Sequence, residues 1–82
     1  MLNLDAMSIK DLNSLYEEVF YHPRLSAKKY NCLVKDMKHL RDYAINKGIA
    51  MQLRQSGNIE IAMKYESICE KIYTYLSESA RW

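Results

Sequence analysis

Apolar residues recur along the chain at intervals of three, four or seven positions. They form one stripe before Gly57-Asn58 and another stripe after it. Side chains at this spacing share one face of an α-helix. The first stripe contains Tyr30, Leu33, Met37, Leu40, Ala44 and Met51, and the second contains Ala62, Tyr65, Cys69, Ile72 and Leu76. The pattern predicts an all-α, three-helix domain built around a long antiparallel helical hairpin.

The first helix of this domain is predicted to run from Ser8 to Tyr21. Ser8 and Asp11 have the spacing of a capping box, in which each side chain accepts a hydrogen bond from the backbone N–H of the other residue. Pro23 disfavours a helical conformation at the residue before it and has no backbone donor. We therefore expect Pro23 to end this helix.

The second helix is predicted to be continuous from its cap at Ser26 to Gly57, about 30 residues and roughly 45 Å long. Gly48 could instead end a helix and split this segment. We favour the continuous helix because Gly48 falls on the apolar stripe, where a missing side chain permits close approach of another backbone. Gly57 is a predicted left-handed C-cap and Asn58 a predicted N-cap, so the third helix, 59–76, should run antiparallel to the second.

The second half of the chain and its two ends contain a set of short segments that form a recognisable pattern. These segments are Leu4-Asp5-Ala6-Met7-Ser8, Asp11-Leu12, Tyr43-Ala44-Ile45-Asn46-Lys47, Ala50-Met51, Arg54, Gly57-Asn58-Ile59, Ala62, Tyr65-Glu66, Ile68-Cys69, Ile72-Tyr73 and Ala80-Arg81-Trp82. The pattern resembles a group of small uncharacterised phage and prophage proteins. The resemblance leaves residues 13–40 unmatched, and the group usually has alanine where this chain has Gly48. It implies an origin and a shape, without a known activity.

The composition fits one domain over residues 1–82, because 49% of the residues are hydrophobic and 27% are charged. Cys32 and Cys69 are too few for a disulfide framework, so we expect reduced thiols, with Cys69 in the core. The chain has no apolar run near the ~18 residues that a membrane span requires. We therefore expect a protein of the host-cell cytoplasm with no membrane partner.

Positive charge is concentrated in the middle of the chain. Residues 24–56 hold eight basic and two acidic side chains, whereas the whole chain has a net charge of +2. A helical projection places several of these basic residues opposite the apolar stripe, where they could contact phosphates, an acidic protein surface or only solvent. The predicted partner-binding residues are Arg24, Lys28, Lys35, Lys38, His39 and, at the chain end, Trp82.

The sequence places no nucleophile beside a base, and His22 and His39 lack the spacing of metal ligands. We therefore expect no enzyme activity, metal or cofactor. The first functional hypothesis is a phage-type binding protein that engages a host or phage protein, for example as an anti-defence inhibitor or a regulator. The alternative is a nucleic-acid-binding accessory protein that uses the basic face.

The apolar face of the third helix is wider than one neighbouring helix can cover. Either the first helix or a second copy of the chain would have to complete it, and we expect a homodimer. Trp82 would either cover the open end of the hairpin or serve as an interface anchor.

Overall fold

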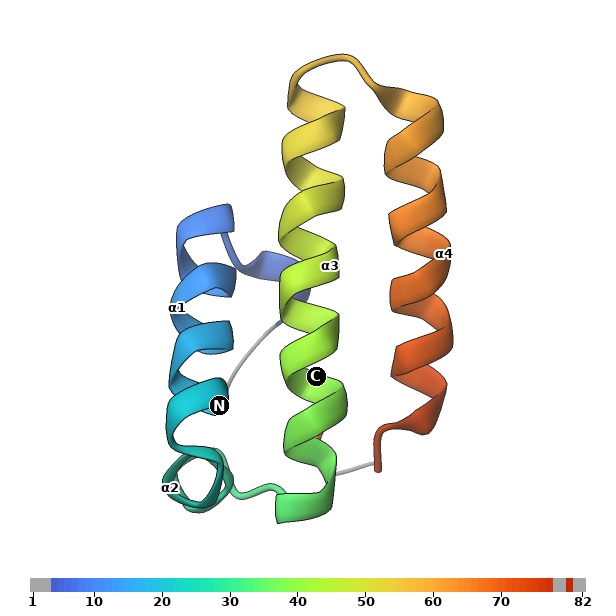
Figure 1. Cartoon of the computed structure of the whole chain (residues 1–82). Helices are drawn as coiled ribbons and strands as arrows, with labels where there is room; N and C mark the ends of the chain where they lie inside the picture. Colours follow the sequence, from blue (N-terminus) through green and yellow to red (C-terminus); the bar gives the residue numbers. More distant parts are fainter. Residues whose placement is uncertain (1–3, 78–79, 81–82) are drawn as a thin grey trace.

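The computed structural model describes residues 4–77 and residue 80, and all regular secondary structure in this part of the chain is helical. Helix α3 lies between α1 and α4 and packs along both of them (Figure 1). The predicted all-α class and the hairpin, which α3 and α4 form, are confirmed. In chain order the elements are the 3-10 helix η1 (Leu4–Ala6), α1 (Ile9–Tyr21), α2 (Pro23–Lys29), the 3-10 helix η2 (Val34–Asp36), α3 (Met37–Gln55) and α4 (Ile59–Tyr75).

Helix α1 begins at the predicted capping box. The Asp11 N–H donates to Ser8 Oγ at 3.2 Å, and the Ser8 N–H donates to Asp11 Oδ2 at 3.4 Å. These two bonds satisfy backbone donors that have no partner within the first turn of the helix. Helix α1 follows its cap at Ser8 and ends at Tyr21, so its predicted start and end are confirmed.

The prediction of one helix from Ser26 to Gly57 is wrong. Helix α2 has seven residues, and α3 has nineteen, which corresponds to about 28 Å. Leu33, which the pattern placed on the apolar stripe, lies between these helices and is 49% exposed. The domain thus has a fourth α-helix within its described residues.

A Schellman motif separates the two helices. Asn31 has φ of 55°, in the left-handed region, and its N–H donates to the Lys28 carbonyl at 3.3 Å. The Cys32 N–H donates to the Ala27 carbonyl at 2.8 Å. This pair of bonds satisfies the last carbonyl groups of α2 and turns the chain out of the helix.

Helix α2 is fixed to the end of α1 through Glu18. Ser26, which was predicted to be a helix cap, lies within α2, and its hydroxyl donates to the Glu18 carbonyl at 3.1 Å. The Tyr30 hydroxyl donates to Glu18 Oε2 at 2.6 Å, and Lys29 Nζ lies 3.0 Å from Oε1. The Tyr30 hydrogen bond, with the smaller contribution of Lys29, lowers the pKa of the Glu18 carboxyl. Glu18 therefore holds the short helix α2 in a fixed position against α1.

The turn between α3 and α4 also forms a Schellman motif. Gly57 has φ of 85°, and the N–H of Asn58 donates to the Leu53 carbonyl at 2.8 Å. Asn58 occupies the predicted N-cap position, although its side chain donates to Ser56 Oγ at 3.2 Å instead of capping α4. The predicted position of the turn is confirmed.

The end of α4 is linked to the start of α3 by a buried carboxylate. Asp36 is 1% exposed, and its Oδ1 accepts hydrogen bonds from the Ser77 N–H at 3.3 Å and the Ser77 hydroxyl at 3.1 Å. Leu4, Leu76 and Ala80 are also buried in the core. In Figure 1 the segment before α1 passes behind α3, and residues from both ends of the described chain belong to the core.

We expect Asn31→Val to lower the free energy of unfolding by about 1–2 kcal/mol, because a β-branched residue is strained in the left-handed region. Asn31→Gly should leave the stability unchanged or raise it, because glycine has no Cβ atom. Chemical denaturation followed by circular dichroism measures both variants. Equal stability of the valine and glycine variants would contradict this account of the break.

We expect Gly48→Ala to raise the free energy of unfolding by about 0.5–1 kcal/mol, because glycine is unfavourable inside a helix. A Cβ at this position would lie 3.7 Å from Asn13 Oδ1 and 3.9 Å from Leu12 Cβ, which are ordinary contacts. Gly57→Ala is the matched control and should lower stability, because its φ is 85°. A loss of stability in Gly48→Ala would show that α1 and α3 cannot accommodate the methyl group.

Candidate functional site

The predicted partner-binding residues do not lie on one face of one helix, because the predicted second helix is interrupted. Arg24 and Lys28 are exposed on α2, Lys35 is exposed in η2, and Lys38 is exposed on α3. His39 is half-buried, and its ring centroid lies 5.6 Å from that of Tyr75 on α4. Trp82 lies outside the described residues.

An aromatic ring lies at the surface beside Lys38. Phe20, near the end of α1, is 48% exposed, and the Arg41 guanidinium carbon lies 5.6 Å from its ring centroid. This distance is within the range of a cation–π contact. The adjacent Tyr21 is 70% exposed, and Val34 of η2 is 54% exposed. We call Phe20, Tyr21, Val34, Lys38 and Arg41 the Phe20 surface.

Two open grooves adjoin this surface, and Phe20 contributes to both of them. The first groove has a volume of about 290 Å³ and the second about 440 Å³. The first is lined by Val19, Phe20, Pro23, Val34, Met37, Lys38 and Arg41. The second is lined by Asn13, Tyr16, Glu17, Phe20, Tyr21 and Ile45. Phe20 therefore lines two depressions, and polar and apolar groups both contribute to their walls.

The two grooves differ in charge. Lys38 and Arg41 line the first groove, whereas Glu17 is the charged residue of the second. Arg41 Nε also lies 3.4 Å from Asp42 Oδ1, and this pair is partly exposed. A molecule that spans both grooves would thus meet positive charge at one end and negative charge at the other.

Lys38 was predicted from the sequence to contact a partner, whereas Phe20 was not. Phe20 follows the helical spacing of the apolar residues of α1, which is a pattern typical of core positions. The buried side of α1 consists of Leu12, Leu15 and Val19, and Phe20 lies beside this group. Arg41, four residues after Met37, was part of the basic segment, but no sequence signal placed it over an aromatic ring.

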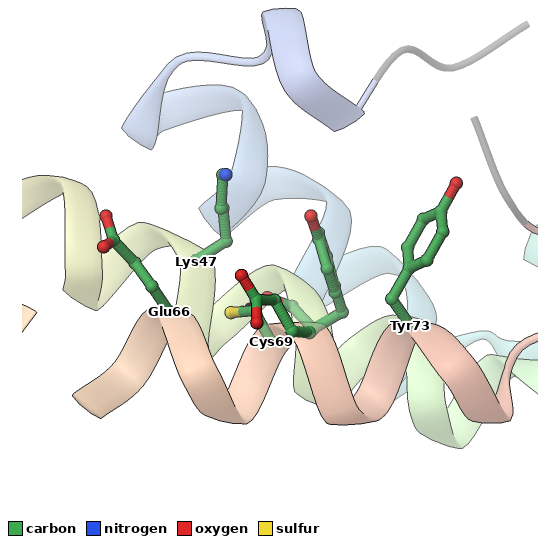
Figure 2. Close-up of a pocket in the computed structure, with 6 residues that line it drawn as sticks. Lys47, Glu66, Cys69 and Tyr73 are labelled. Atoms are coloured by element: carbon green, nitrogen blue, oxygen red, sulfur yellow. Dashed lines mark hydrogen bonds between the residues drawn. The ribbon is translucent and has the colours of Figure 1, made fainter. Parts of the chain in front are cut away.

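A further cavity lies between α3 and α4, with a volume of about 600 Å³. Figure 2 shows Lys47 of α3 and Glu66 and Tyr73 of α4 projecting to the same side of the hairpin. Arg54 Nη2 donates to Glu66 Oε1 at 2.8 Å, and a second bond joins Arg54 Nε to Oε2. These hydrogen bonds lower the pKa of the Glu66 carboxyl.

Cys69 lies at the same cavity and is 4% exposed, as predicted for a core residue. Its Sγ lies 3.9 Å from the Tyr43 carbonyl oxygen. Burial raises the pKa of the thiol to about 11. Because the thiolate is the nucleophilic form, this cysteine is a weak nucleophile at neutral pH.

Helix α4 carries an apolar stripe that α3 covers only in part, because Ile72 packs against the core and the Tyr75 ring lies near His39. Cys69 faces α3, whereas Ile68 is 43% exposed. Helix α1 packs against α3 on the side away from α4 (Figure 1), so it does not complete this face. The stripe has alternating spacings of four and three residues, which are typical of paired helices. Its members are Ile61, Tyr65, Ile68, Ile72 and Tyr75.

Among residues 4–77 and 80, no three histidine, cysteine, aspartate or glutamate side chains are grouped so that they could hold a metal ion. No helix in this part of the chain is both long enough and apolar enough to cross a membrane. In the comparisons with known proteins, no family model matches the chain, and neither a curated protein nor a solved structure is significantly similar to it.

Proposed function

We propose that the chain is a non-enzymatic binding protein that engages another protein through the Phe20 surface. The observation that carries this proposal is an exposed phenylalanine under an arginine, between two grooves. Aromatic and arginine side chains are enriched among residues that dominate the binding energy of protein interfaces. Burial of Phe20 and Val34 would supply apolar contact, and Lys38 would favour an acidic partner.

The partner in this proposal is a protein of a phage or of its host. This part rests on the resemblance of the second half of the chain to small phage and prophage proteins. A small protein that occupies the surface of a larger one can act as an anti-defence inhibitor or as a regulator. Its place of action would then be the host cytoplasm.

A nucleic-acid-binding accessory protein is the second candidate. The observation that favours it is the group of exposed basic residues on three consecutive elements, namely Arg24, Lys28, Lys35 and Lys38. Contacts of these residues with phosphates would make binding fall steeply as salt increases. A gel shift with random-sequence duplex DNA at two salt concentrations tests this candidate.

We expect Lys35→Glu/Lys38→Glu to lose the protein partner while retaining the fold, because both side chains are exposed. Quantitative mass spectrometry of proteins co-purified from the host compares this variant with the wild-type protein. The matched control is Lys10→Glu/Lys64→Glu, which makes the same change of charge at exposed positions of α1 and α4. The proposal is wrong if both double variants retain the same proteins as the wild type.

We also propose that two copies of the chain associate through the α4 stripe. We expect light scattering to show a dimer that dissociates on dilution, and Ile68→Glu to be monomeric with an unchanged melting temperature. Met63→Glu is the matched control, because Met63 is an exposed apolar residue of α4, 56% exposed, that lies off the stripe. A wild-type monomer mass that does not change over a tenfold dilution would rule out this dimer.

A further inference from the structure

We propose that the partner presents an amphipathic helical segment with segregated charge, and that this segment lies across Phe20 with one apolar side chain in each groove. The inference rests on the proposed function and specifies which class of partner the surface binds. It follows from three properties of the Phe20 surface: the paired grooves, the exposed ring between them and the difference in charge between their ends.

The paired grooves determine the apolar part of the segment. Both grooves use Phe20 as a wall, so two apolar side chains on one face of a helix can lie on either side of its ring. Residues three or four positions apart are neighbours on a helix. Amphipathic helices bind apolar grooves through side chains with this spacing. The segment should therefore carry a pair of large apolar residues at i and i+3 or i+4.

The charges determine the polar part of the segment and its orientation. Lys38 and Arg41 line the first groove, so the end of the segment above it should be acidic. Glu17 lines the second groove, so the end above it should be neutral or basic. A uniformly acidic ligand such as a nucleic acid would place negative charge next to Glu17. Charge complementarity therefore favours a protein segment.

Asp42 influences how strongly the acidic end is held. Its Oδ1 lies 3.4 Å from Arg41 Nε, so Arg41 is shared between this carboxylate and the ring of Phe20. A partner carboxylate can approach Lys38 directly, because that side chain is exposed. We therefore expect Lys38 to provide the main charge contact and Arg41 mainly to orient the Phe20 ring.

The probe for this inference is a yeast-displayed library of random 16-residue peptides. The library is selected for peptides that bind the labelled wild-type protein, and peptides that also bind the Phe20→Asp variant are then removed by counter-selection. We expect the enriched peptides to carry an apolar pair at i and i+3 or i+4, with acidic residues toward one end. A synthetic version of an enriched peptide should bind at least tenfold more weakly to Lys38→Glu, and its affinity should fall as sodium chloride increases.

Two further variants keep the test independent of the stability of Phe20→Asp. Val34→Asp changes an exposed residue of the first groove on another element, and it should also weaken peptide binding at least tenfold. Lys10→Glu should leave peptide binding unchanged. Circular dichroism melts establish that each variant is folded before binding is measured.

The inference is overturned if no peptide survives the counter-selection, or if the enriched peptides lack the apolar pair or are basic throughout. It is also overturned if a fluorescent random-sequence DNA binds with a dependence on Lys38 and none on Phe20. One outcome is that the library yields no such peptide while Lys35→Glu/Lys38→Glu loses a cellular protein. In that case the inference of an amphipathic helical segment is wrong, and the proposed protein-binding function is supported. If the expected peptides bind while that variant keeps all its cellular proteins, the surface can bind such a segment, but the proposed function fails and the inference about its partner fails with it.

Discussion

The structure depends on one constraint, which is that α3 has to bury side chains toward helices on two sides. On one side Gly48 lies close to Leu12 of α1, and on the other the Tyr43 carbonyl lies beside Cys69 of α4. Because each outer helix covers only one side of α3, each also keeps apolar residues at the surface. The exposed Phe20 and the stripe around Ile68 both follow from this arrangement. A bundle in which α1 and α4 also packed together would bury more apolar surface and leave less for partners.

Two local features of the fold were predicted from the sequence. The capping box at Ser8 and the left-handed Gly57 need only neighbouring residues, and both are present as expected. The break at Asn31 was missed because asparagine is less specific than glycine as a left-handed C-cap. In addition, Tyr30 and Leu33 continue the spacing of the α3 apolar residues backwards by coincidence. A seven-residue spacing cannot by itself distinguish one long helix from two helices with a connecting turn.

The sequence predicted the exposed basic residue of the candidate site, Lys38, but it did not predict the exposed aromatic residue, Phe20. Lys38 belongs to the basic middle of the chain and is exposed as expected. Phe20 and Val19 are adjacent apolar residues in α1, but Val19 is 2% exposed and Phe20 is 48% exposed. The difference arises from the direction in which α3 approaches α1, which is a tertiary property that helical spacing does not contain. His39 differs from its prediction in the opposite direction. It was predicted to lie on the exposed basic face, but its ring lies against Tyr75.

Ion pairs and apolar contacts at the Phe20 surface have different energetic roles. The pair between Arg41 and Asp42 is partly exposed, and ion pairs of this kind contribute about 0–1 kcal/mol each. A partner carboxylate that replaced Asp42 would therefore gain little net free energy. Apolar burial can contribute more, since complete burial of a fully exposed phenylalanine or valine side chain contributes about 1.5–3 kcal/mol. About half of that contribution remains for a partner, because Phe20 is 48% exposed and Val34 is 54% exposed. Phe20 and Val34 would thus determine how long a complex persists, whereas Lys38 would mainly set the orientation and rate of association, as charges at the edge of interfaces do.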